Sequence, residues 1–420
     1  MGRARGLIEK GVFVAWLASL FLGTRYVFGE PQAFGEAQYL EYTRFFLPLS
    51  LVTSWLFIAV FRRHAPQIHG RTFISLLLLV VAIGLSAGNA ANPGLSVWWF
   101  LLLSSYSLAA VLAIFYARNV PQARRTILVT VTVLAVAQVV LGLLQLSTGH
   151  TFGLSLLGEP SASDATPGIA KILLSGVRLI RPLGTYPHAN LFGAIAVVGL
   201  AAASFATTSA SYASRLTYRL TVGLLTIGVV LSFSRSAWLA LLMLCIVTFF
   251  LAGRKRWMFT SSVVVALSAL AIVWLPLISS RFLIGEQVNQ IALRNTLATE
   301  SINVWLSNPW VGVGLRNFVV DLSVRHPDWL GFELQPPHNV LLLMLAEIGI
   351  VGLAALAAVL VPLFRRWPLI ALGVLAVLAP LLFLDHYAIS ITQGTGIVLL
   401  FVQIMALYSV PRKTNSSRTT

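Results

Sequence analysis

About twelve apolar stretches divide the sequence, and each is long enough to cross a membrane as a helix. A transmembrane helix needs about 17 to 25 predominantly apolar residues. We therefore predict an all-α polytopic membrane protein with about twelve transmembrane helices. The predicted spans are residues 11–28, 40–61, 72–90, 96–117, 126–147, 188–207, 216–233, 236–252, 257–278, 340–363, 369–388 and 394–410.

The composition supports this class. Of the 420 residues, 58% are hydrophobic and 10% are charged, which is typical of a chain solvated by lipid and not of a soluble domain. Cys245 is the single cysteine, which excludes an intrachain disulfide and a thiolate metal cluster. We find no internal repeat, so residues 1–420 are predicted to form a single integral membrane domain.

The basic residues indicate the topology. A net charge of +16 would suit nucleic-acid binding in a soluble protein, but in a membrane protein it first marks the cytoplasmic face. Seven segments hold 19 of the 29 Lys and Arg residues, and Glu9 is their only acidic residue. Because basic residues resist translocation, we predict that these segments and both termini are cytoplasmic. The segments are the N-terminus, 62–71, 118–125, 208–219, 253–257, 364–368 and the C-terminal tail.

The first apolar stretch lacks a small-residue cleavage site, so it is predicted to be retained and not to be a signal peptide. Two long loops, 148–187 and 279–339, then fall on the opposite, non-cytoplasmic face. Loops of this length in a compact bundle are usually functional. In the second loop, apolar residues at helical spacing predict a helix over 286–307, and the sequence NPW followed by GVG predicts a helix stop and a turn.

Polar motifs gather on the same face as the two long loops. They are RPLGTYPHANLFG (181–193), LSFSRSAWL (231–239), PPHN (336–339) and DHYAISITQGTG (385–396). Ionisable residues at membrane depth are costly unless they line a polar cavity, so each is a candidate functional residue.

Structural explanations also exist for the candidate cations. Arg235 could extend its guanidinium to the membrane interface, and Arg181 could bind loop carbonyls. Arg294 could be a surface cation or pair with Glu286 or Glu300.

The other polar groups have structural alternatives too. His188 and His338, each with a nearby asparagine, stand where helices begin and could cap free N–H groups. Gly349 and Gly352 are interpreted as helix-packing glycines in preference to ligand contacts. The pair Asp385–His386 could be a satisfied loop pair.

Arginines and a histidine on one face suit a lipid diphosphate substrate. A guanidinium forks onto phosphate oxygens, and an imidazole accepts a proton near neutral pH. The sequence has no DxD motif or Asp/Glu/His cluster for a diphosphate-bound divalent ion, so we predict neither a metal nor a cofactor. Arginines would neutralise the leaving diphosphate, and a neutral histidine would deprotonate an attacking hydroxyl.

The pattern HN, nine residues, then GxxG (His338, Asn339, Gly349 and Gly352) resembles the signature of bacterial O-antigen ligases. The remaining motifs, between about residues 140 and 400, are similar to those of the wider O-antigen ligase and polymerase superfamily. The resemblance implies a GT-C-type helical glycosyltransferase with a large periplasmic loop between helices nine and ten.

The implied activity is the metal-independent, inverting transfer of a polysaccharide from undecaprenyl diphosphate to a lipid A–core hydroxyl. This reaction belongs to lipopolysaccharide biosynthesis in the bacterial inner membrane, with the active site periplasmic. By the resemblance, His338, Arg235 and Arg294 are the catalytic residues. The expected substrate contacts are Arg181, His188, Asn339, Asp385, His386 and Gln393.

Other functions remain open at this point. A polymerase of the same superfamily would use the same residues but take a second lipid-linked glycan as acceptor. A protein O-oligosaccharyltransferase would often carry an additional periplasmic domain at its C-terminal end. A polysaccharide transporter or flippase would instead line a path through the membrane with its charged residues.

Overall fold

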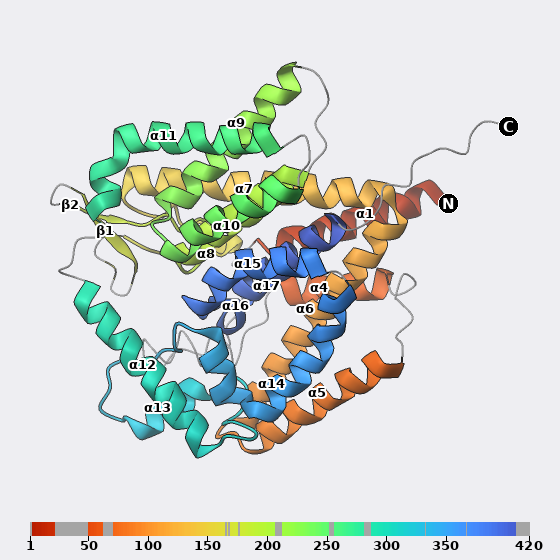
Figure 1. Cartoon of the computed structure of the whole chain (residues 1–420), viewed down its shortest axis with the longest axis vertical. Helices are drawn as coiled ribbons and strands as arrows, with labels where there is room; N and C mark the ends of the chain where they lie inside the picture. Colours follow the sequence, from red (N-terminus) through yellow and green to blue (C-terminus); the bar gives the residue numbers. More distant parts are fainter. Residues whose placement is uncertain are drawn as a thin grey trace.

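The computed structural model describes residues 2–21, 49–61, 70–163, 166, 169–174, 177–205, 212–251, 256–280, 287–331, 333–366 and 368–408. Within these residues the chain is helical apart from turns, one isolated β-bridge and one two-stranded antiparallel sheet, so the predicted all-α class holds (Figure 1). The basic loop at 62–69, residues 208–211 and 252–255, and the tail from 409 lie outside the described residues.

Each predicted apolar stretch coincides for most of its described length with one helix. These helices are α1 (Gly2–Ser19), α4 (Leu49–Phe61), α5 (Gly70–Gly88), α6 (Pro93–Asn119), α7 (Pro121–Thr148), α8 (Ala189–Phe205), α9 (Tyr212–Leu231), α10 (Arg235–Leu251), α11 (Arg256–Ser280), α14 (Val340–Arg366), α15 (Pro368–Phe383) and α17 (Thr392–Tyr408). Between them lie η3 (Ser155–Leu157), β1 (Lys171–Leu174), β2 (Val177–Ile180), α12 (Gln287–Ser307), α13 (Phe318–Arg325) and α16 (Tyr387–Ser390).

Among the described residues, four helical segments are long and apolar enough to cross a membrane by length and composition: Pro93–Ala117, Gln122–Thr148, Ser214–Leu231 and Val340–Pro362. Shorter apolar helices accompany them. Several also expose large apolar side chains outward, as Leu77, Leu78 and Val81 do on α5. A helix that is apolar on its outer face suits a lipid environment, so the helices fit a multi-pass membrane protein. The count of twelve spans stays a prediction.

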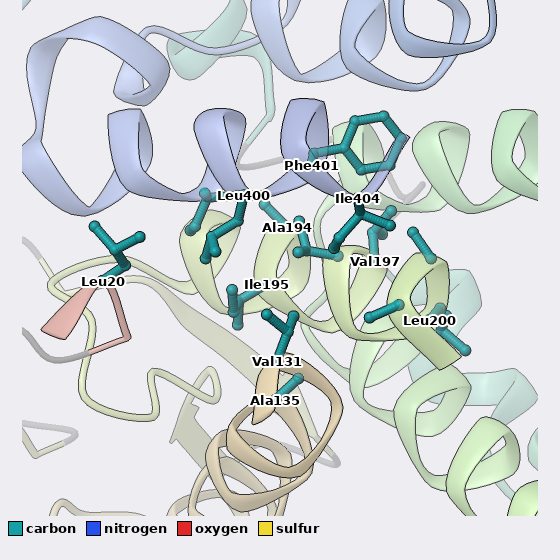
Figure 2. Packing of buried hydrophobic residues seen from close by; sticks show 14 of the residues in the cluster. Leu20, Val131, Ala135, Ala194, Ile195, Val197, Leu200, Leu400, Phe401 and Ile404 are labelled. Carbon is teal, nitrogen blue, oxygen red and sulfur yellow. The ribbon is translucent and has the colours of Figure 1, made fainter. Parts of the chain in front are cut away.

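Helix α8 forms the centre of the core. All its residues except Asn190 are buried, and it packs against α7, α9, α10 and α17. Figure 2 shows its Ile195 facing Val131 and Ala135 of α7, with Leu400 of α17 on its other side. Small residues permit this close approach, since a Cβ added at Gly199 would lie 2.4 Å from the Cβ of Ala135.

Two glutamines on one face of α7 hold the segment that leads into α8. The Gln145 Oε1 atom accepts a hydrogen bond from the Gly184 N–H group (2.8 Å), and Gln138 Oε1 accepts one from Thr185 N–H (2.9 Å). Gln145 also donates to the buried Glu159 carboxylate at 2.7 Å. Seven residues separate the two glutamines, which is two helical turns, so both side chains point to the same side.

The long loop folds onto the first half of α14 (Figure 1). The predicted helix 286–307 is confirmed as α12, which ends at Ser307 immediately before the NPW sequence. A second apolar cluster joins α12, α13 and α14 through buried residues that include Leu297, Phe318 and Leu343. The described part of the loop is therefore packed against α14, and this packing holds α12 in place.

Gly349 does not pack helix against helix, which corrects the interpretation of this glycine. It interrupts α14 with φ 63° and ψ −170°, a conformation that only glycine adopts readily. A Cβ at this position would lie 2.4 Å from the Trp310 carbonyl oxygen. The loop backbone enters this break, where Val313 N–H donates to the Ala346 carbonyl and Ile350 N–H donates to the Pro309 carbonyl.

Candidate active site

Four segments far apart in the sequence bring polar side chains together. His338 precedes α14, Asp385 and His386 lie between α15 and α16, His188 precedes α8, and Arg181 follows β2. The Nδ1 atom of His338 lies 3.6 Å from Asp385 Oδ1, and the His338 and His386 ring centroids are 5.1 Å apart. The structure thus joins the PPHN and DHYAIS motifs into one cluster.

Asp385 is a buried carboxylate with fixed partners. Its Oδ2 atom accepts a hydrogen bond from the side-chain amide of Asn190, and its Oδ1 atom accepts one from the His386 backbone N–H at 3.2 Å. Burial alone raises the pKa of Asp385, but the adjacent His338 more than offsets this effect, so the pKa of Asp385 lies below the ordinary value. The carboxylate is therefore ionised at neutral pH.

Arg181 fixes the position of Asn190. Its guanidinium donates to the Ser232 carbonyl from Nε (2.9 Å) and Nη2 (2.7 Å), and Nη2 also donates to Asn190 Oδ1 at 2.9 Å. Strand β2 positions Arg181, because the Arg181 N–H donates to the Ala170 carbonyl and so extends the hydrogen bonding of the β1–β2 hairpin by one pair. A chain of contacts therefore runs from Arg181 through Asn190 and Asp385 to His338.

His188 acts as a helix cap, which is the structural alternative considered for it. Its Nδ1 atom accepts a hydrogen bond from the Asn190 backbone N–H at 3.1 Å, and its carbonyl accepts one from Leu191 N–H. The ring also contacts Tyr387, with centroids 4.6 Å apart. Burial in the turn before α8, aided by Arg181, lowers the pKa of His188 to about 3, so the ring is neutral.

At the other helix entry the capping group is Asn339 and not His338. The Asn339 Oδ1 atom accepts hydrogen bonds from Leu341 N–H (2.9 Å) and Leu342 N–H (3.1 Å), and this satisfies two otherwise unpaired donors of α14. The His338 ring instead faces Asp385, with 15% of its side chain exposed. The capping explanation therefore applies to Asn339 and leaves the histidine available for another role.

Arg235 and Arg294, the two predicted catalytic arginines, lie on two further elements. Arg235 is the first residue of α10, directly after the turn that holds the Ser232 carbonyl, and Arg294 lies partly buried on α12. Arg294 lies within electrostatic range of both Arg235 and His188. Glu300, one of the partners considered for Arg294, instead lies 3.2 Å from His326, and Glu286 is outside the described residues.

Comparison with known families gives one match. Residues 220–357 match the family model described as O-antigen ligase. This stretch of the chain is an O-antigen ligase family domain. No curated protein matches the sequence. The resemblance to this family is thereby confirmed, and it implies a glycosyltransferase-type enzyme acting on lipid-linked polysaccharide.

The ligase domain contains Arg235, Arg294, His338 and the GxxG glycines, whereas Arg181 and Asp385 lie outside the match. The fold brings these outer residues to the domain: Arg181 binds the Ser232 carbonyl, and Asp385 lies against His338. The cluster therefore depends on segments before and after the matched region.

The predicted site residues do not include Arg316, which lies in the second long loop. Its guanidinium lies 4.7 Å from the centre of the Trp99 ring, it is buried, and its backbone has a left-handed φ of 67°. Trp99 in turn donates from Nε1 to the Ile389 carbonyl at 3.0 Å, so Arg316 supports the segment that carries Asp385. Its position two residues after the GVG turn is the sequence signal that could have identified it.

The remaining candidates lie at the edge of the cluster. The Nδ1 atom of His386 hydrogen-bonds with the Ser390 hydroxyl, and burial together with the neighbouring His338 holds the pKa of His386 well below its ordinary value. Gln393 is buried in the first turn of α17. Its role in substrate binding stays a prediction.

Proposed function

We propose that the protein is an O-antigen ligase that transfers a polysaccharide from undecaprenyl diphosphate to a hydroxyl of a lipid A–core oligosaccharide. The observation that carries the proposal is the 3.6 Å approach of His338 Nδ1 to the buried, ionised Asp385, in a chain with an O-antigen ligase domain. A histidine oriented by a buried carboxylate is a common arrangement for a general base.

In this proposal Asp385 selects the reactive form of His338. A proton held on Nδ1 beside the carboxylate leaves Nε2 as the atom that accepts the proton of the acceptor hydroxyl. Asp385 then stabilises the imidazolium that forms. A separation of 3.6 Å is long for a hydrogen bond, and such contacts often shorten only when substrate binds.

Arg235 and Arg294 would stabilise the leaving group. As the acceptor oxygen bonds to the anomeric carbon from the opposite face, the bond from that carbon to the diphosphate oxygen breaks and the configuration inverts. The electron pair departs with undecaprenyl diphosphate, whose negative charge the guanidinium groups of Arg235 and Arg294 would stabilise. No step requires a metal. We assign Arg181 and Asn190 to positioning, because they hold the carboxylate that orients the base.

We also propose the membrane arrangement expected from the charges. The basic segments and both termini lie in the cytoplasm, and loops 148–187 and 279–339 lie in the periplasm with the site at the membrane surface. The protein would then act at the inner membrane of a bacterium.

Reconstitution tests the activity and separates it from polymerisation. The purified protein in lipid vesicles is given lipid-linked polysaccharide and lipid A–core, with EDTA present throughout. A ligase moves the polysaccharide onto lipid A–core, whereas a polymerase joins two lipid-linked glycans and leaves lipid A–core unmodified. If the folded protein makes neither product, the proposed transferase reaction is wrong.

A further inference from the structure

His386 has no assigned part in the proposed reaction, yet it lies inside the same cluster. His338, Asp385 and His386 each offer one possible metal-ligand atom, and these three atoms all lie within 4.8 Å of one another. Asp385 and His386 are buried and His338 is mostly buried. Among the described residues, this is the group of three with metal-ligand spacing.

The ligand chemistry selects a particular class of ion. Two imidazoles and one carboxylate match the preferences of Zn²⁺ and its transition-metal neighbours. Mg²⁺ and Ca²⁺ prefer sites made mainly of oxygen atoms, and here Asp385 is the one carboxylate of the cluster. The site would therefore discriminate against the divalent ions that commonly accompany diphosphates.

Outer hydrogen bonds already orient two of the ligands. The Ser390 hydroxyl engages His386 Nδ1, which directs the opposite ring nitrogen, Nε2, as the ligand atom. The Asn190 amide engages Asp385 Oδ2 and leaves Oδ1 toward His338. Partners of this kind fix ring and carboxylate orientation in protein metal sites.

Ion binding would require the three ligand atoms, which lie within 4.8 Å of one another, to move closer together. Ligand atoms at 2.0–2.1 Å from a tetrahedral Zn²⁺ lie about 3.3 Å apart, and His338 Nδ1 and Asp385 Oδ1 are 3.6 Å apart. The arginines near the cluster oppose a divalent cation, so the affinity should fall below that of a structural zinc site.

We propose that His338, Asp385 and His386 form an inhibitory site for a transition-metal ion of the Zn²⁺ class. Coordination at His338 Nδ1 places the only remaining ring proton on Nε2. That nitrogen then donates a hydrogen bond and cannot accept the proton of the attacking hydroxyl. The inhibitory consequence rests on the proposed function, whereas metal binding itself does not.

Direct binding is the first test. Tag-free protein in detergent is titrated with Co²⁺, followed by visible absorption, and with Zn²⁺, followed by calorimetry, and we expect one site per chain. His386→Gln and Asp385→Asn should abolish this site. Ser390→Ala keeps all three ligands and should weaken binding by about 10- to 100-fold, as loss of an orienting partner does.

His326→Gln is the matched control. His326 also lies near a carboxylate, with Nε2 3.2 Å from Glu300, but within the part of the chain that the structure describes it belongs to no group of three ligands. This variant should bind Co²⁺ as the wild type does. Thermal unfolding of each variant establishes that lost binding is not lost folding, and Ser390→Ala provides the test should the ligand variants fail to fold.

Transfer activity is the second test. Zn²⁺ should lower the wild-type rate by at least about 10-fold, EDTA should restore it, and Mg²⁺ at the same concentration should have no such effect. The metal site is refuted if neither ion binds, or if binding survives in folded His386→Gln and Asp385→Asn proteins. Binding without inhibition in an active protein refutes the inhibitory role. Binding by a folded protein that transfers no glycan leaves the metal site intact and refutes the proposed transferase function.

Discussion

His338 and Asn339 have different roles at the start of α14. Asn339 caps α14 with its side chain, and His338 turns its ring toward Asp385. The sequence alone could not assign these tasks, because both residue types suit a helix start and the carboxylate partner is 47 positions away. At the entry of α8 the same two residue types reverse their tasks: His188 caps the helix, and Asn190 binds Asp385.

The division of tasks predicts separate phenotypes for neighbouring residues. His338→Gln and His338→Asn should reduce transfer nearly as much as His338→Ala, because neither amide can take up a proton. Donor binding and protein abundance should stay near wild type. Asn339→Ala should lower stability by about 0.5 to 2 kcal/mol through loss of the cap. Transfer within a few-fold of wild type in His338→Gln, measured at matched expression, would exclude the base role.

The carboxylate supplies a second test of the same site. Asp385→Asn keeps the side-chain shape but removes the charge that stabilises the imidazolium, so kcat should fall by at least about 10²-fold. Asn190→Ala should reduce kcat less, because it loosens Asp385 without neutralising it. Both effects should appear in kcat more than in KM. Equal activity of Asp385→Asn and the wild type would show that the 3.6 Å contact has no catalytic role.

The arginines should show the behaviour of diphosphate contacts. Arg235→Ala and Arg294→Ala should each reduce transfer by about 10²-fold or more, as loss of an electrostatic contact in the transition state does. Lysine should rescue poorly at either position, because it lacks the planar fork. The assay is repeated in EDTA, and inhibition by EDTA that Mg²⁺ reverses would contradict the metal-free mechanism.

At the scale of elements, the periodic and apolar parts of the chain were predictable and the irregular parts were not. Each apolar stretch overlaps a helix, and the helical spacing of residues such as Leu293, Leu297 and Trp305 identified α12. Apolar periodicity carries no information about an interruption, so the break in α14 at Gly349 was missed. It arises from contact with the 309–313 backbone, which only the folded structure brings near.

This break predicts an unusual sensitivity at one glycine. Gly349→Ala would place a Cβ 2.4 Å from the Trp310 carbonyl oxygen and in a strained left-handed conformation, so we expect a loss of at least about 1 to 3 kcal/mol of stability. Gly84→Ala on α5 is the control, because a Cβ there meets nothing within 4 Å and alanine favours helix. Similar unfolding temperatures for the two variants in detergent would contradict the proposed docking of the loop.

For the whole molecule, chain order hides the candidate site and tertiary packing assembles it. The candidate site draws on three distant regions of the chain. More than a hundred residues separate Arg181 from His338, and the helices α14 and α15 separate His338 from Asp385. Helix α8 lies at the centre of the core. The resemblance to family motifs predicted that these residues share a site, but it did not predict which of them contact one another. The ligase-domain match likewise ends before Asp385, although this carboxylate contacts the domain's histidine.

The membrane arrangement can be tested with single cysteines in a Cys245→Ala background. Because the basic loops resist translocation, a cysteine at Arg125 should react only with reagents that reach the cytoplasm. Cysteines at Leu156 and Val324, both highly exposed, should react with impermeant reagents from the periplasm. The same orientation places His338 where a lipid-linked donor and a lipid A–core acceptor could meet on the periplasmic side. Labelling of Val324→Cys from the cytoplasm alone would overturn the topology, and it would also remove the proposed site from the compartment that its acceptor requires.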